Sequence, residues 1–325
     1  MVNIIPNNIV PYIFPVGEGC MVSFLAANSL EKQLLSFYPR LHISYVFEFR
    51  VEDGKDQVDL AMAISEKEDL QFFKIYFDKT HDHKKVGIWF SNCIALQEKE
   101  QAIKSFWIEA DLDGSEQDQI PSLFISPKQK SITLAEMTSF FEVLNLQSLN
   151  NKNQEFLKQC INALEDSQYI EHFGVMHSRG DSKTTRMYIR GFEKDSLLLF
   201  LHKINWPGDK EVLIKQFEGI SMVSYISVAI EFNDVWLPTI GIEFHLKKGI
   251  EYSDAFLHKL KTSGFCTERR VAAIRDILCP KKIKSGKFTY KRSLSHFKIT
   301  LGRAKKIEPK VYVQLTPNYL GVMGF

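Results

Sequence analysis

The sequence lacks the short motifs that mark several large classes of enzyme. It contains no GxxxxGK[ST] phosphate-binding loop, no GxSxG nucleophile elbow, no HExxH zinc helix and no GxGxxG dinucleotide fingerprint. These absences argue against a P-loop nucleotide hydrolase, an α/β-hydrolase, a zincin protease and a Rossmann dehydrogenase. Any function must therefore come from residues that the fold brings together from distant parts of the chain.

Cysteine is scarce, and long apolar runs are absent. The five cysteines among 325 residues are scattered without a CxxC pair, and their odd number argues against a disulfide framework. A reducing cytoplasm suits such a chain. No window reaches the length of a membrane span, and residues 1–19 have no basic region and contain three prolines. We therefore expect neither a transmembrane helix nor a signal peptide.

The chain also has little net charge. With 41 Lys and Arg against 39 Asp and Glu, the formal charge is +2, which makes no general case for nucleic acid. Basic residues do gather between Arg269 and Lys310, where they favour an anionic partner as small as a diphosphate. Recognisable metal-ligand spacings are absent around the histidines His81, His83, His172 and His177. The sequence therefore predicts no metal held by these histidines.

What the sequence does have is alternation of polar and apolar residues, interrupted by helical segments. Period-two alternation and intervening turns predict five β-hairpins, at residues 42–64, 105–126, 172–191, 225–246 and 295–316. Helical segments separate the hairpins, and one of them begins at Thr133 with a Thr-Leu-Ala-Glu capping box. Because each hairpin is antiparallel and closes locally, this is not the order of a parallel βαβ sheet.

These elements predict a mixed α/β (α+β) fold with one domain over residues 1–325. We expect a closed barrel of ten antiparallel strands ringed by α-helices, with residues 1–40 as an arm and a short helix from Asn28 packed on it. The alternation of polar and apolar residues is equally compatible with an open sheet that has one face exposed to solvent.

The stretch TRMYIRGF indicates which side chains face the interior. In an extended chain Arg186, Tyr188 and Arg190 share one face, while Met187 and Ile189 share the other. An isolated strand of this kind is usually an ordinary surface strand, but the pattern repeats in the other hairpins. The same parity predicts a polar lining that includes Glu48, Trp107, Glu109, Glu243, His245, His296, Lys298, Lys310 and Tyr312.

TRMYIRGF, followed by a short helix, resembles a strand of the cyanobactin peptide prenyltransferases, which are members of the ABBA prenyltransferase superfamily. IGIEFHLKKG is similar to the next even strand of that family, and SHFKITL with KVYVQL is similar to its last strand pair. The likeness covers residues 170–317 by motif and 40–165 by pattern. It implies a PT barrel built from αββα repeats.

The resemblance implies transfer of a prenyl group from dimethylallyl or geranyl diphosphate to a peptide acceptor, and it allows for a Mg²⁺ cofactor. Arg186 and Arg190 would contact the diphosphate, Tyr188 and Tyr312 would shield the carbocation, and Glu48 would be the acceptor-orienting base. Two features depart from the family pattern. The segment VDLAMAI lacks the expected basic residue, and Glu243 stands where an aromatic residue is expected.

The chemistry of the predicted lining suits ionisation of an allylic diphosphate. Cationic side chains stabilise the leaving group, and an aromatic face stabilises a nearby cation by roughly 0.5–2 kcal/mol. The candidates for binding diphosphate are Arg186, Arg190, Lys298 and Lys310, with Arg50 as a further one. The candidates for lining the site and shielding the cation are Tyr188, Tyr312, Trp107 and His245. Glu48 or Glu109 is the candidate base that takes a proton from the acceptor.

Two other functions fit the same residues. A non-catalytic barrel that binds a peptide or an anionic ligand is the alternative if the Arg and Tyr faces point outward. Nucleic-acid binding through residues 281–310 is disfavoured because TYKRSLSHFKITLGRAKK predicts the loop and strand of a hairpin, not a platform for bases. The sequence therefore predicts a cytoplasmic prenyltransferase of peptide natural-product biosynthesis, with no nucleic-acid partner.

Overall fold

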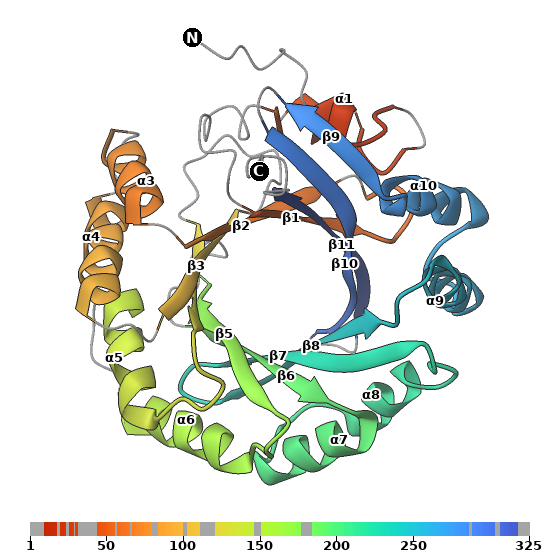
Figure 1. Ribbon diagram of the computed structural model, residues 1–325. Coiled ribbons are helices and arrows are strands. Elements are labelled where there is room, and N and C mark those ends of the chain that lie inside the picture. The colour runs from red at the N-terminus through yellow and green to blue at the C-terminus, as the bar shows by residue number, and fades with distance from the viewer. Residues whose placement is uncertain are drawn as a thin grey trace, which may run out of the picture.

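The computed structural model describes residues 10–17, 20–23, 26–28, 30–31, 44–55, 57–65, 67–79, 84–99, 103–110, 121–145, 151–176, 184–285, 288–302 and 306–317. Within these residues a closed β-barrel occupies the centre, and helices surround most of its circumference (Figure 1). Several predicted features lie wholly or largely outside the described residues: the helix expected from Asn28, the loop 113–121, and His81, His83 and His177.

One antiparallel sheet of eleven described strands forms the barrel. The strand order is β11-β1-β2-β3-β4-β5-β6-β7-β8-β10-β9, and pairing of β10 with β11 closes the wall. The strands are β1 Ser44–Arg50, β2 Val58–Ile64, β3 Ile103–Ala110, β4 Ser122–Pro127, β5 Tyr169–Val175, β6 Thr185–Phe192, β7 Val223–Phe232, β8 Trp236–Leu246, β9 Lys281–Ser285, β10 Phe288–Leu301 and β11 Ile307–Pro317. All except β9 belong to the closed wall, so the prediction of a ten-stranded antiparallel barrel is confirmed.

Helices lie outside the barrel. They are α1 Val10–Ile13, α3 Lys67–Lys79, α4 Lys84–Lys99, α5 Leu134–Asn145, α6 Asn151–Ala163, α7 Lys194–Lys203, α8 Lys210–Gln216, α9 Ile250–Thr262 and α10 Glu268–Leu278. The predicted capping box begins α5: the Glu136 amide donates to Thr133 Oγ1 at 3.2 Å, and the Thr133 amide donates to Glu136 Oε2 at 2.8 Å. None of the described helices combines the length and apolar character needed to cross a bilayer.

The hydrophobic core fills the space between these helices and the outer face of the barrel. Phe200 of α7 packs on Phe192 of β6, and Phe256 of α9 stacks on Phe297 of β10 at 4.6 Å. Burying each such side chain contributes about 1.5–3 kcal/mol. Met187 of β6 is fully buried in the same layer, so its strand turns its apolar face to the helices. The alternate, polar positions therefore face the lumen.

The last hairpin is longer than the sequence suggested. We expected TYKRSL, residues 289–294, to be a loop; instead β10 begins at Phe288, and its first half pairs with β9. The segment is strand because Tyr290 and Arg292 are buried there. The Arg292 guanidinium donates hydrogen bonds to main-chain carbonyls in α1 and α10. Arg292, one of the basic residues of this segment, thus ties β10 to the helices.

Candidate active site in the barrel lumen

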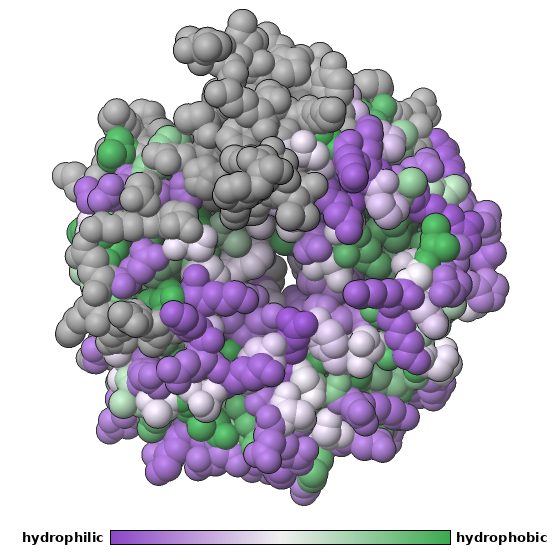
Figure 2. Space-filling model, viewed as in Figure 1, coloured by the Kyte–Doolittle hydropathy of each residue, from purple (hydrophilic) through white to green (hydrophobic). Residues whose placement is uncertain are grey.

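The lumen holds two cavities lined by the polar faces of the strands. The larger, of about 420 Å³, is lined by Glu48, Trp107, Glu109, Tyr188, Arg190, Tyr312 and other residues of the wall. The smaller, of about 40 Å³, is lined by Arg186, Lys298 and Lys310, with Glu48 and Tyr312 at the border that it shares with the larger one. Figure 2 shows a narrow opening at the centre of the molecule, bordered in part by hydrophilic residues.

Glu48 lies at the centre of a buried hydrogen-bond cluster. The pairing of β1 with β11 puts Glu48 opposite Tyr312, whose hydroxyl donates to Glu48 Oε2. Lys310 Nζ is 2.5 Å from Glu48 Oε1, and the Arg50 guanidinium contacts the same oxygen. Arg50 also donates to Asp59 Oδ2 at 2.6 Å. Burial holds the pKa of Tyr312 well above its usual value, so the phenol remains a donor to the carboxylate.

Arg186 forms an ion pair with a residue of the adjacent strand. The pairing of β6 with β7 puts it opposite Glu231, and Arg186 Nε donates to Glu231 Oε1 at 2.9 Å. Burial alone lowers the pKa of Arg186, but the negative charge of Glu231 outweighs it and raises that pKa well above its usual value. Arg186 also donates to the Tyr188 hydroxyl at 3.3 Å. Its charge is therefore permanent.

Lys298 lies between the two tyrosines that the sequence assigned to cation shielding. Its Nζ is 4.7 Å from the ring centroid of Tyr188 and 5.7 Å from that of Tyr312. It is also 3.3 Å from Glu243 Oε1. A side chain at position 241 would exclude it, because a Cβ on Gly241 would lie 2.4 Å from Lys298 Cε. The two aromatic rings thus lie beside the ammonium group of Lys298, and shielding of a carbocation by them stays a prediction.

Arg190 belongs to a different part of the lumen from Arg186. Arg190 donates to Glu171 Oε1 at 2.6 Å and to the Tyr225 hydroxyl, whose ring stacks on His245 at 4.3 Å. Four residues of extended chain separate the two arginines, about 13 Å. The smaller cavity contacts Arg186, whereas the larger one contacts Arg190. The geometry groups Arg186 with Lys298 and Lys310, and shared binding of one diphosphate by both arginines stays a prediction.

Trp107 and Glu109 line the larger cavity from β3. The Trp107 ring lies 5.3 Å from that of His172, whose Nδ1 is 2.6 Å from Ser126 Oγ. The surrounding protein lowers the pKa of His172 by desolvation, although its ring borders the cavity. Glu109 is therefore placed as the sequence predicted, on the same cavity as Glu48.

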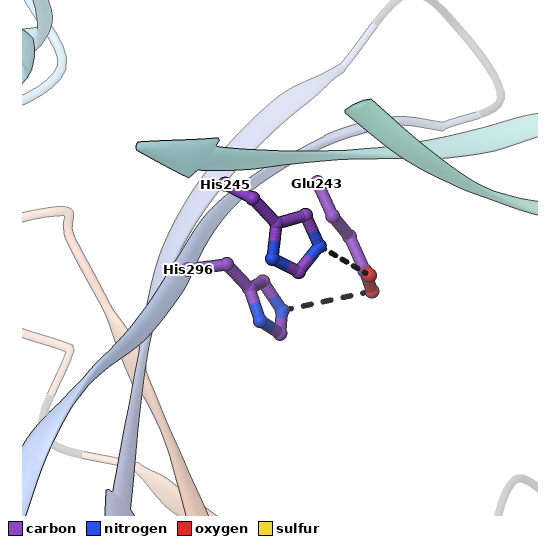
Figure 3. A group of neighbouring side chains, drawn as sticks. All are labelled: Glu243, His245 and His296. Atoms are coloured by element: carbon purple, nitrogen blue, oxygen red, sulfur yellow. Dashed lines mark ion pairs between the residues drawn. The ribbon is translucent and has the colours of Figure 1, made fainter. Parts of the chain in front are cut away.

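Glu243, His245 and His296 form a group that the sequence did not assign as a site (Figure 3). Burial lowers the pKa of His296 to about 3, so its ring is neutral at pH 7. Burial raises the pKa of Glu243, but nearby positive charge, above all Lys298 once His296 is neutral, lowers it well below the usual value. The His296 position was visible in the sequence as part of the lining. Its neighbours depend on the strand register, which the sequence did not provide.

A Mg²⁺ cofactor, which the resemblance allows for, stays a prediction for this lumen. Mg²⁺ requires several oxygen ligands, usually carboxylates, waters and substrate phosphates. Five carboxylates of the lumen each contact an Arg or Lys side chain: Glu48, Asp59, Glu171, Glu231 and Glu243. An ion bound to any of these would have to displace the neighbouring Arg or Lys side chain, and no step below depends on Mg²⁺.

Solved structures of prenyltransferases share this fold. The chain matches the apo form of the prenyltransferase PriB with a TM-score of 0.58 and 9% identity, over 91% of this chain and 92% of that one. It is similar to 6-dimethylallyltryptophan synthase from Micromonospora olivasterospora in complex with DMASPP and Trp (TM-score 0.51, 13% identity, 85% of this chain and 81% of that one). It is also similar to NotF in complex with brevianamide F and DMSPP (TM-score 0.53, 10% identity, 91% and 89%).

No protein-family model and no curated protein sequence matches the chain. The structural likeness therefore shows the fold alone: these prenyltransferases share the antiparallel barrel ringed by helices that the resemblance of TRMYIRGF implied. The narrower likeness to the cyanobactin enzymes stays a prediction.

Proposed function

We propose that the protein transfers an allylic isoprenoid from its diphosphate to a nucleophilic acceptor inside the barrel. The observation that carries this proposal is the convergence of Arg186, Lys298 and Lys310 on one cavity, with Tyr188 and Tyr312 beside the Lys298 ammonium. Ionisation of an allylic diphosphate requires cations at the leaving group and aromatic faces around the carbocation. A site for a diphosphate donor is also consistent with the fold, since two structures that share it are complexes with DMASPP or DMSPP.

The cations of the smaller cavity bind the diphosphate by exchanging partners. In the free protein Lys298 contacts Glu243, and Lys310 contacts Glu48. A diphosphate carries more negative charge than one carboxylate and offers more acceptor oxygens, so it attracts both ammonium groups and the permanently charged Arg186. Movement of Lys298 toward the diphosphate frees the space between the two tyrosine rings. The carbocation then occupies that space.

Glu48 orients the acceptor and receives its proton. Its carboxylate lies on both cavities, next to the cations on one side and the larger space on the other. When Lys310 turns to the diphosphate, Glu48 loses one of its donors and becomes a better acceptor for an N-H or O-H group. General-base assistance of this kind contributes about 10²- to 10⁴-fold in rate.

The acceptor is a side chain of a ribosomally made peptide. The larger cavity, of about 420 Å³, falls within the usual range for small-molecule sites and accommodates a short prenyl chain with one acceptor side chain. The rest of a peptide would remain at the barrel mouth. Dimethylallyl or geranyl diphosphate fits this division of space, and an aromatic ring suits the lining by Trp107, Phe124 and Tyr188.

A mass-spectrometric screen tests the proposal. Dimethylallyl, geranyl and farnesyl diphosphate are each incubated with linear peptides, cyclic peptides and free aromatic amino acids. A mass increase of one prenyl group is expected with wild-type protein and with Arg275→Ala, because Arg275 is an exposed residue paired with Asp254 on the surface. Arg186→Ala should abolish it. Tight binding of peptide or diphosphate without any product would favour the non-catalytic barrel instead.

A further inference from the structure

Three side chains able to bind a metal meet on one wall of the larger cavity. Glu243 and His245 alternate on β8, so they share its lumen face. The pairing of Lys298 with Glu243 brings β10 alongside, and the next inward position of β10 is His296. One ligand atom from each residue lies within 4.8 Å of the other two. Figure 3 shows both imidazole rings and the carboxylate directed toward a common space.

The contacts within this group are too long for hydrogen bonds. His296 Nε2 is 3.6 Å from Glu243 Oε1, and His245 Nε2 is 3.8 Å from Glu243 Oε2. His296 is more than nine-tenths buried, and its Nε2 has no hydrogen-bond partner. Leaving a buried polar atom without a partner costs about 1–3 kcal/mol. A ligand in the common space would recover that cost.

The surrounding residues fix the two rings in place. A register shift between Leu294 and His296 marks a β-bulge at Ser295, and bulges commonly re-aim a side chain next to a functional site. The His296 ring stacks on Tyr312 at 4.2 Å, and the His245 ring stacks on Tyr225 at 4.3 Å. His296 Nδ1 is 3.0 Å from Ser295 Oγ, which leaves Nε2 to face the common space. Both imidazoles are therefore held in place, and a metal ion on His245 Nε2 would replace the contact of that atom with Ser227 Oγ at 3.1 Å.

We propose that Glu243, His245 and His296 bind a divalent transition-metal ion, with Zn²⁺ as the ion that fits the ligands best. Two imidazoles and one carboxylate are a set that Zn²⁺ takes when its fourth position stays open. Ligand atoms in a tetrahedral site lie about 3.4 Å apart, and those of the present group lie within 4.8 Å of one another, so binding requires a contraction of at most about 1.4 Å. All three residues line the larger cavity, so the open position faces it. The site is inferred from its own geometry and not from the proposed prenyl transfer, although Lys298 takes part in both.

Lys298 competes with the ion for Glu243. Its Nζ is 3.3 Å from Glu243 Oε1, and a metal ion on that carboxylate repels it. The ammonium has a second acceptor, the Tyr188 hydroxyl at 3.5 Å, to which it can turn. Lys298→Met should therefore strengthen metal binding. A carboxylate that only holds Lys298 in place would give no such gain.

Isothermal titration of metal-free full-length protein with Zn²⁺ tests the site. One ion per chain is expected, and Co²⁺ should gain the intense visible absorption of four- or five-coordinate ions. His296→Gln or His245→Gln should weaken Zn²⁺ binding by more than the roughly 10- to 100-fold that loss of an outer-shell partner costs. His172→Gln in the same cavity and His258→Gln on the surface of α9 are matched controls that should bind as wild type.

Thermal unfolding separates a lost site from a lost fold. Zn²⁺ should raise the thermal unfolding midpoint of the wild type and of His172→Gln. It should not raise that of His296→Gln, even if this variant unfolds at a lower temperature than the wild type in the absence of metal. His245 is less buried than His296, so His245→Gln serves as a second variant if His296→Gln does not fold. Equal Zn²⁺ affinity in wild type and both ligand variants, or no binding to wild type, would overturn the proposal.

Discussion

Glu48 and Tyr312 lie directly opposite each other in the pairing of the first and last barrel strands, and the tyrosine hydroxyl donates to the carboxylate. The two residues are 264 positions apart in the sequence. Closure of the barrel thus creates the contact, and the same closure brings Lys310 Nζ to 2.5 Å from Glu48. A carboxylate that the sequence assigned to acceptor chemistry is therefore also the counter-ion of a candidate diphosphate ligand.

Replacing this carboxylate tests the assigned base. Glu48→Gln keeps the size of the side chain but removes its charge, so Lys310 and Arg50 remain available to the diphosphate. We expect donor affinity close to that of wild type and turnover lowered by about 10²- to 10⁴-fold. Steady-state kinetics with a mass-spectrometric readout and a separate donor-binding titration measure the two effects. Full turnover in Glu48→Gln, with a large loss in the matched variant Glu109→Gln, would move the role to Glu109.

The two arginines of β6 should differ in their contribution to donor binding. Arg186 lines the same cavity as Lys298 and Lys310. Arg190 lies at a different position along the barrel axis, where it contacts Glu171 and Tyr225. Loss of one charge-assisted contact to the diphosphate costs about 1.5–3 kcal/mol. Titration of a non-reactive donor analogue should show a loss of this size in Arg186→Ala and a smaller loss in Arg190→Ala. Unchanged affinity in both variants would leave the diphosphate assignment without support.

Stability should also depend on the Arg186 pair. The guanidinium and the Glu231 carboxylate are both buried, and breaking a buried ion pair by removing one partner costs about 3–5 kcal/mol. We expect a loss of this size in urea unfolding of Arg186→Met and of Glu231→Leu. The double variant should lose less than the sum, since replacing both charges by apolar groups avoids an uncompensated charge. Additive losses would mean that the two charges do not stabilise each other.

The barrel could be predicted from the sequence because its strands alternate strictly. Tyr45, Phe47 and Phe49 of β1 are fully buried, and Val46 and Glu48 between them line the lumen, as period two requires. The extension of β10 was missed because Lys291 and Arg292 follow each other and blur the alternation. Arg292 is buried only because main-chain carbonyls of distant helices accept its hydrogen bonds. Local pattern does not contain such long-range contacts.

The ion pairs of the lumen were beyond the reach of sequence reasoning for a similar reason. The cationic side chains were identified correctly as lining residues, but their partners depend on the register of strands far apart in the chain. Arg186 and Glu231 are 45 positions apart, and Lys298 and Glu243 are 55 apart. The alternation of residues along a strand assigns each side chain to the inner or the outer face of the barrel. Its ion-pair partners also depend on where each residue lies along the barrel axis. His296 was therefore noted as lining without its neighbours being known.

Acid should destabilise the protein partly through His172. Desolvation lowers the pKa of this histidine in the folded protein, while the unfolded chain has the ordinary value of about 6.5. The unfolded state therefore binds more protons below that pH. The contribution of the neutral His172 ring to the free energy of unfolding is fully present above about pH 6.5. Below that pH it falls by up to roughly 1.4 kcal/mol per pH unit. Urea unfolding at several pH values should show a shallower decline for His172→Gln. An unchanged slope would place the acid lability in other groups.

Two glycines of the lumen should respond differently to the same substitution. A Cβ on Gly174 would lie 2.0 Å from the main-chain carbonyl oxygen of Leu123, and the barrel wall cannot yield there without losing its register. Gly174→Ala should therefore cost at least the roughly 1–3 kcal/mol of an overpacked core, as measured by urea unfolding.

Gly241 faces a flexible side chain instead. A Cβ there would lie 2.4 Å from Lys298 Cε, so the lysine can turn away with little loss of stability. Gly241 lines the smaller cavity beside Lys298, so a Cβ there takes space that the lysine and the diphosphate need, and Gly241→Ala should weaken donor binding by about tenfold, the equivalent of one hydrogen bond. Equal losses of stability in the two alanine variants would contradict the packing argument. Unchanged donor affinity in Gly241→Ala would show that the space beside Gly241 is not part of the diphosphate site.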